Sequence, residues 1–306
     1  MKRSIVFAAI IAIVGSGGGA MGQTCSFSPA PAGANFGNYS VFAGGGPQIT
    51  TPTFNVQCTA ANTQIGVLFT RGTNSASYTP RTMMRAGGTL LSYNLYLDAA
   101  DTQIWGDGSG TTSWKFVTTG AANTVFVPAI PIYGSLPTGA DVPAGVYSDT
   151  ITATLYWLQG GNLTWTTANF NVTATVLSEC TVSAFAINFG AYEPVVTNKI
   201  VPLDSTATIS VFCTKNTSGN VTLDNGSNFS AGNRRMKTGG GAFMTYDVYT
   251  DAARTTIWNA VNINTASSTS KLTALGGGFT AYGRIAAGQD VPAGAYTDTL
   301  QSVVNY

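Results

Sequence analysis

The sequence predicts an all-β protein of two immunoglobulin-like antiparallel sandwiches, the second of which lacks its final strand. Most of the chain alternates apolar and polar residues in short runs, which Gly- and Pro-rich turns separate. No stretch after the first residues keeps a helical period. The order of these runs also occurs twice, so the second half of the chain repeats the first. Together these features indicate two domains of one fold.

Residues 1–22 are predicted to be a secretory signal peptide. Lys2 and Arg3 precede an apolar run at 5–14 that is too short to cross a bilayer, and small residues follow it. We expect cleavage after Ala20 or Gly22. The remaining chain then divides into domains at 23–178 and 179–306, and no later run is long enough to span a membrane.

The four cysteines fit an exported protein. Cys25 and Cys58 have the same spacing as Cys180 and Cys213, at equivalent places in the two repeats. Equal spacing predicts one disulfide in each domain, Cys25–Cys58 and Cys180–Cys213. The alternative, metal ligation, is disfavoured because the chain has no His and no paired Cys-x-x-Cys.

Composition argues against several classes of function. Charged residues make up 9% of the chain and the net charge is +1, so no electrostatic field would attract nucleic acid. An enzyme is disfavoured because there is no His and because acidic residues recur at the same place in both repeats, as Asp149 and Asp298 do. Such recurrence favours turn and strand-edge roles. We expect no cofactor and no metal.

The strands of the first domain are expected in order along the chain. They fall at 49–58, 64–70, 89–97, 114–118, 124–136, 146–157 and 163–177. A tight Gln-Gly-Gly-Asn turn at 159–162 joins the last two as a hairpin.

The second domain repeats the first motif by motif. Asn-Phe-Gly-x-Tyr stands at 35–39 and 188–192, Arg-x-Met at 81–83 and 234–236, a loop Trp at 105 and 258, Tyr-Gly at 133–134 and 282–283, and Ala-Gly-x-Tyr-x-Asp-Thr at 144–150 and 293–299.

The repeat is incomplete at its end. Alignment of the last motif places Tyr306 opposite Trp157, so residues 158–177 have no counterpart in the second domain. The second sandwich would then expose apolar core and unpaired backbone, which invites strand addition from another chain. The alternative is that another strand of the same domain covers this edge. The residues expected to accept the added strand are Tyr296, Thr299, Leu300, Val303, Val304 and Tyr306.

A donor subunit needs a free alternating arm before its first domain. Only a few residues separate the expected cleavage site from Cys25. We therefore expect this chain to accept a strand but not to donate one, and to stand at the end of an assembly.

These motifs together resemble the spore coat protein U domain family, and the resemblance covers both halves. It implies subunits of archaic (Csu-type) chaperone–usher pili, assembled by donor-strand complementation, and a two-domain member without a donor arm is similar to the tip adhesin. The implied partners are a periplasmic chaperone, an outer-membrane usher and a neighbouring pilin that donates the strand. The implied location is the pilus tip at the cell surface, reached through the periplasm, with a role in attachment and biofilm formation. One departure is that Tyr133-Gly134 precedes Ser-Leu-Pro, where the second copy has Arg-Ile-Ala.

Aromatic and aliphatic residues gather around the turns at the pole of the first domain that the 158–162 hairpin forms. We predict that they contact a surface, and the resemblance implies a hydrophobic, abiotic one. Alternatives are that they pack the core, as the repetition of Trp105 by Trp258 suggests for Trp105, or that they stack on a glycan. A coat structural protein is the alternative of another class. The predicted contact residues are Trp105, Trp114, Tyr156, Trp157, Leu158, Leu163 and Trp165.

Overall fold

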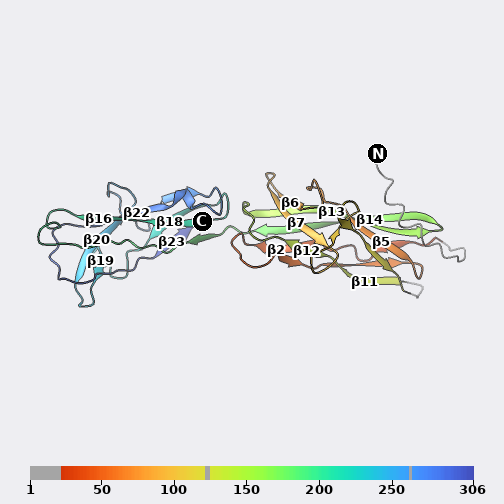
Figure 1. Cartoon of the computed structure of the whole chain (residues 1–306), viewed down its shortest axis with the longest axis horizontal. Coiled ribbons are helices and arrows are strands. Elements are labelled where there is room, and N and C mark those ends of the chain that lie inside the picture. The colour runs from red at the N-terminus through yellow and green to blue at the C-terminus, as the bar shows by residue number, and fades with distance from the viewer. Residues whose placement is uncertain (1–21, 121–124, 262–263) are drawn as a thin grey trace. The chain divides into compact units, whose positions relative to one another are not determined.

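The computed structural model describes residues 22–120, 125–261 and 264–306, so nearly all of the predicted signal peptide lies outside the described residues. The chain forms two compact units (Figure 1). Unit 1 comprises residues up to 140 together with 145–176, and unit 2 comprises 141–144 together with 177–306. In the described part of the chain, no helix is long and apolar enough to cross a membrane.

Unit 1 consists of strands that follow the predicted alternation. Along β13, residues of one parity are buried from Tyr147 to Trp157, while most of those between them are at least partly exposed. The strands are β1 (Cys25–Phe27), β2 (Ala34–Tyr39), β3 (Gln48–Thr50), β4 (Thr53–Cys58), β5 (Gln64–Phe69), β6 (Arg81–Arg85), β7 (Leu90–Tyr96), β8 (Ile104–Trp105), β9 (Thr112–Ser113), β10 (Lys115–Thr118), β11 (Val125–Pro131), β12 (Tyr133–Leu136), β13 (Gly145–Gln159) and β14 (Asn162–Val176).

Two sheets make up unit 1. One has the order β1–β4–β11, and the other runs β10–β5–β13–β6–β7–β12–β3 with β14 joining β13 to β2. The predicted single strand at 49–58 is divided into β3 and β4, which belong to different sheets. Pro52 lies at this break, and proline has no amide hydrogen to give to a ladder.

The β13–β14 hairpin is as predicted. Its two 15-residue strands pair without interruption from Gly145–Val176 to Gln159–Asn162. The turn residues Gly160 and Gly161 have φ angles of 56° and 82°, a left-handed conformation that glycine adopts without strain.

Unit 2 repeats the architecture with fewer paired residues. Its sheets have the orders β16–β22–β20–β19, β21–β18–β23 and β15–β17. The strands are β15 (Cys180–Val182), β16 (Leu203–Ile209), β17 (Val211–Cys213), β18 (Ser218–Leu223), β19 (Arg234–Lys237), β20 (Phe243–Tyr249), β21 (Asn264–Ser267), β22 (Phe279–Ile285) and β23 (Ser302–Asn305), and a 3-10 turn spans Leu275–Gly277.

Both predicted disulfides form, Cys25–Cys58 between β1 and β4 and Cys180–Cys213 between β15 and β17. The predicted all-β fold of antiparallel sheets is confirmed; parallel pairing occurs between β14 and β2 and between β8 and β9.

The repeated motifs build equivalent cores. Trp105 and Trp258 are fully buried, and each indole N–H donates to a strand carbonyl, Val67 O at 2.9 Å and Val221 O at 2.8 Å. The buried Arg81 and Arg234 donate to the backbone oxygens of Trp105 and Trp258. Each motif arginine therefore fixes the loop that carries its tryptophan, and the polar groups of both are satisfied.

Candidate functional site

The first candidate site is the place in unit 2 that β14 fills in unit 1. In unit 1, β14 pairs antiparallel with β13 along its whole length and parallel with β2, where Val172 lies beside Ala34 and Val176 beside Tyr39. The repeat makes residues 294–306 the equivalent of β13, and 187–192 the equivalent of β2. Among the described residues, no strand of unit 2 pairs with both of these segments.

β14 closes unit 1 with one face. Its inward side chains, Phe170, Val172, Ala174 and Val176, are each at most 4% exposed. In unit 2, two adjoining cavities of about 360 and 720 Å³ lie at the equivalent place and share several lining residues. We call them together the groove. Its apolar walls include Phe185, Ile187, Phe189, Met236, Tyr246, Tyr296 and Leu300.

The open groove changes the secondary structure of its two walls. The Asn-Phe-Gly-x-Tyr motif is a strand in unit 1, β2, but its copy at 188–192 is not. The segment equivalent to the 15-residue strand β13 likewise contains only the four-residue strand β23. Before β23, this segment forms a single isolated bridge, between Thr297 and Lys237. Both walls lack these ladders because a ladder needs a partner strand, and no described strand of unit 2 takes the place of β14.

The predicted acceptor residues fall on two faces of the 296–306 segment. Tyr296, Leu300 and Val304 are partly buried and pack against the core of unit 2. Thr299, Val303 and Tyr306 are exposed. Sequence reasoning missed the opposite wall at Phe185, Ile187 and Phe189, although the copy of that wall in unit 1 is the repeated motif of β2.

The polar group in the groove wall is already engaged. Asp298 accepts hydrogen bonds from Tyr246 Oη at 2.7 Å, from Asn228 Nδ2 at 2.9 Å and from Asn228 N at 3.2 Å. Asp149 accepts from Tyr93 Oη at 2.7 Å in the same way. Burial raises the pKa of the Tyr246 and Tyr93 hydroxyls well above the usual value, and the carboxylate that each hydroxyl bonds raises it further. Each pair ties the Ala-Gly-x-Tyr-x-Asp-Thr segment to a neighbouring strand, β7 in unit 1 and β20 in unit 2.

The second candidate site is the outer face of the sheet β10–β5–β13–β14. Cross-strand pairing places four residues in one row, Phe116, Gly66, Tyr156 and Trp165. Because Gly66 has no side chain, the ring of Trp114 can lie over the middle of this row, 3.0 Å from where a Cβ would be. The cleft has a volume of about 370 Å³, and we call this surface the aromatic face.

Several side chains of the aromatic face are available to a partner. Trp165 is 61% exposed, Phe116 54% and Leu158 38%. The rings form two pairs on either side of Gly66, Trp114–Phe116 with centroids 4.4 Å apart and Tyr156–Trp165 with centroids 6.3 Å apart. Gln64 and Thr118 supply polar groups at the cleft, and none of the described residues that line it is charged. This surface suits a flat apolar partner or a sugar ring.

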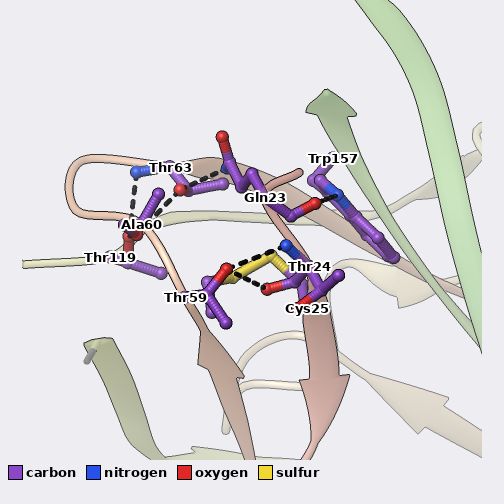
Figure 2. The surroundings of a disulfide bond; sticks show 9 residues. Gln23, Thr24, Cys25, Thr59, Ala60, Thr63, Thr119 and Trp157 are labelled. Atoms are coloured by element: carbon purple, nitrogen blue, oxygen red, sulfur yellow. Dashed lines mark hydrogen bonds between the residues drawn. A yellow bond between two sulfur atoms is a disulfide. The ribbon is translucent and has the colours of Figure 1, made fainter. Parts of the chain in front are cut away.

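The structure corrects two of the predicted contact residues. Trp105 is fully buried and stacks on Phe69, with centroids 4.1 Å apart. Trp157 is 5% exposed, because it shares the inward parity of β13, and its Nε1 donates to Gln23 O at 3.1 Å beside the Cys25–Cys58 disulfide (Figure 2). Trp105 therefore presents no surface to a partner, and Trp157, although it lines the cleft of the aromatic face, leaves only 5% of its surface exposed.

The remaining predicted residues, Trp114, Tyr156, Leu158, Leu163 and Trp165, lie together at the aromatic face. Sequence reasoning missed Phe116. Its position two residues after Trp114 in an alternating strand was the available signal.

Comparison with known proteins identifies relatives of the chain. The Spore Coat Protein U domain matches residues 19–154 and again residues 166–302. Protein U of Myxococcus xanthus is 31% identical over 182 residues, which cover 54% of this chain and 98% of Protein U.

A solved structure also matches. It is a chain of the CsuC–CsuE chaperone–tip adhesion subunit pre-assembly complex from the archaic chaperone-usher Csu pili of Acinetobacter baumannii. The match covers 92% of this chain and 100% of that one, at 18% identity and a TM-score of 0.56. At this identity the likeness shows a shared fold.

Proposed function

The chain belongs to the spore coat protein U domain family, and on that premise we propose that it is an adhesive subunit of a chaperone–usher pilus. In this proposal unit 2 accepts a strand from a neighbouring subunit, and unit 1 attaches to a surface. Export through the periplasm, a chaperone that holds the open unit and an outer-membrane usher belong to the same proposal. The fold shared with the Csu complex supports it.

The observation that carries the proposal is the groove of unit 2. Unit 1 shows what such a groove holds when it is filled, namely an antiparallel strand with alternate apolar side chains. By the repeat, Leu300 is equivalent to Ile151, which pairs with Phe170, and Tyr296 is equivalent to Tyr147, which pairs with Ala174. We therefore expect a donor strand with a large apolar residue opposite Leu300 and a small one opposite Tyr296.

A peptide with the sequence of residues 162–177 tests this proposal on the full chain. We expect it to bind unit 2 and to protect the amides of residues 185–192 and 294–301 from hydrogen exchange, because both walls gain a partner strand. The control is the same peptide with Asp in place of Phe170 and Val172. Equal protection by both peptides, or by neither, would contradict strand acceptance.

The aromatic face is the proposed contact surface of unit 1. Replacing Phe116, Leu158 and Trp165 by Ser should remove most attachment to polystyrene, because these side chains are exposed and supply its apolar area. The matched control replaces Ile49 and Leu90, exposed residues of other strands of unit 1, by Ser. Equal attachment by both variants would sink this assignment.

A glycan is the second candidate partner, because aromatic rings flank a cleft that polar Gln64 and Thr118 also line. Inhibition of attachment by free monosaccharides, with Trp165→Ser abolishing that sensitivity, would favour it over an abiotic surface.

A position at the end of the pilus also belongs to the proposal. Gln23 and Thr24 form hydrogen bonds within unit 1: Gln23 O accepts from Trp157 Nε1, and Thr24 N donates to Thr59 Oγ1. These bonds support the proposal that the two residues are not part of a free arm that fills another subunit's groove. The alternative is a coat protein, which would polymerise through both units. Electron microscopy of pili labelled on this chain distinguishes the two, since a terminal subunit is found only at filament ends.

A further inference from the structure

The loop that follows the groove wall of unit 2 exposes an unusual amount of apolar surface. Within residues 193–201, which we call the valine loop, Val195 and Val196 are each 73% exposed, Ile200 79% and Val201 50%. Apolar side chains gathered so openly in one short loop indicate a partner.

The valine loop has a defined shape. The carboxylate of Glu193 accepts hydrogen bonds from the backbone N–H groups of Val195, Val196 and Thr197 at 2.6–2.9 Å. Asn198 accepts from Glu193 N at 2.8 Å and donates to Val201 O at 2.9 Å. Its backbone polar groups are thus turned inward to one another, and its apolar side chains are held outward before any partner arrives.

The equivalent loop of unit 1 has no such surface. Residues 40–47 read Ser-Val-Phe-Ala-Gly-Gly-Gly-Pro, and Val41 is 1% exposed. The two loops occupy the same place in the fold, between Tyr39 or Tyr192 and the next strand. The exposed apolar side chains are therefore a feature of unit 2 and not a requirement of the fold.

The direction of a strand in the groove leads to this loop. β14 enters beside the end of β13 and leaves where Val176 lies beside Tyr39 and Gly145. A donor strand in the same register would leave unit 2 beside Tyr192 and Gly294, which both line that end of the groove together with Pro194. The valine loop begins one residue after Tyr192, so it lies at the point where the donor chain emerges.

We propose that the valine loop is the docking surface for the folded domain of the subunit whose arm fills the groove. This inference rests on the proposed strand acceptance and adds a second contact to it. The chain offers a measure of the connection needed, since only residues 177–179 separate β14 from β15, the first strand of the next domain. A donor subunit with a connection of similar length would bring its own domain against the valine loop, where that domain would cover these side chains.

The test compares two variants of the full chain. The first replaces Val195, Val196 and Ile200 by Ser. The second, a matched control, replaces Val261 and Leu272 by Ser, which are 84% and 78% exposed on other loops of unit 2. All five side chains are already open to solvent, so neither variant should unfold the unit.

Two measurements then separate the arm from the domain. The first is the affinity of the 162–177 peptide, which we expect to be equal in the wild type and both variants, within about twofold, because the peptide carries no domain. The second is the rate at which the native donor subunit leaves its complex with the chain in mild guanidinium. The complex is purified from pili of the source bacterium through a tag on the chain. We expect about tenfold faster release from the valine-loop variant and an unchanged rate from the control, since interface substitutions act mainly on dissociation.

Equal release rates for the two variants would overturn the docking proposal. The proposal would also be overturned if the valine-loop variant lost its chaperone complex but kept a donor complex as stable as that of the wild type. The loop would then bind the chaperone and not the donor domain. If the peptide and the donor both fail to bind the wild-type chain, strand acceptance itself is wrong.

Discussion

Units 1 and 2 have equivalent cores, but no described strand of unit 2 takes the place of β14. This difference separates what the motifs specify from what β14 adds. The Tyr–Asp hydrogen bond is 2.7 Å in both, and the loop tryptophan is fully buried in both. The neighbours of β14 are among the parts that differ: β2 is a six-residue strand in unit 1, and no strand forms at 188–192 in unit 2. The motifs therefore hold the interior, while regular structure at the open edge depends on a strand far along the chain.

Supplying the missing strand should have the largest effect. We predict that a copy of residues 158–177 added after Tyr306 stabilises unit 2 by several kcal/mol. Each large apolar side chain that it buries contributes about 1.5–3 kcal/mol, and the ordering of the new hairpin reduces the sum. Urea unfolding of the full chain measures this as a shift of the transition of unit 2 alone.

The control for this extension carries Asp at the positions equivalent to Phe170, Val172, Ala174 and Val176. It has the same length and turn but cannot fill the groove, because unpaired carboxylates are costly to bury. A similar shift from both extensions would mean that the groove is not shaped for an alternating strand.

A matched pair of substitutions should have an intermediate effect. Ile151 in unit 1 and Leu300 in unit 2 occupy the same place in the repeat, but Ile151 is fully buried and Leu300 only partly. We predict that Ile151→Ala costs about 2–5 kcal/mol and that Leu300→Ala costs clearly less. With the donor peptide bound, the cost of Leu300→Ala should approach that of Ile151→Ala. Denaturant unfolding with and without peptide checks this, and equal costs without peptide would show that the groove is already closed.

The open edge could be predicted from the sequence because it depends on local signals. Alternation locates the strands, the Gly-Gly turn joins the last two, and the repeat aligns residues 294–306 with 145–157, which makes them one wall of the groove. The disulfides followed from equal spacing. The opposite wall of the groove could not be read in this way, because the pairing of β2 with β14 is parallel and joins segments far apart in the sequence.

The aromatic face was only partly predictable for a related reason. Nearness to a turn did not decide whether a side chain points inward. Trp157 follows the parity of Ile151 and Leu155 and is buried, whereas Tyr156 and Trp165 are paired neighbours on the outer side. The parity of the strand therefore predicts which of these side chains are buried. The burial of Trp105 could not be predicted in this way, because it depends on a loop that Arg81 fixes from another strand.

The smallest effect is expected at the edge strands, where the two units use different chemistry. In unit 2, Asp204 of β16 accepts two hydrogen bonds from Arg284 of β22, at 2.7 and 2.8 Å, and lies 3.3 Å from Arg254. The pairing registers place Ile49 and Ser135 at the equivalent positions of unit 1, where no such ion pair is possible. We predict that Asp204→Asn destabilises unit 2 by less than about 1 kcal/mol at neutral pH, since both side chains of the pair are about one-third exposed and solvent screens them.

The pH dependence of this substitution identifies the ion pair as its cause. The hydrogen bonds from Arg284 hold the pKa of Asp204 below its usual value. Because the pKa is lowered in the folded unit, the carboxylate contributes its full stabilisation above the ordinary carboxyl pKa of about 4 and loses it as the pH falls through the folded value. The difference between the wild type and Asp204→Asn should therefore be constant from pH 5 to 7 and shrink below about pH 4. It should also shrink in 1 M salt, which screens exposed charges. Urea unfolding of the hairpin-extended chain at each pH measures the difference. If it persisted unchanged in acid and in salt, packing by the Asp204 side chain, and not its charge, would stabilise this edge.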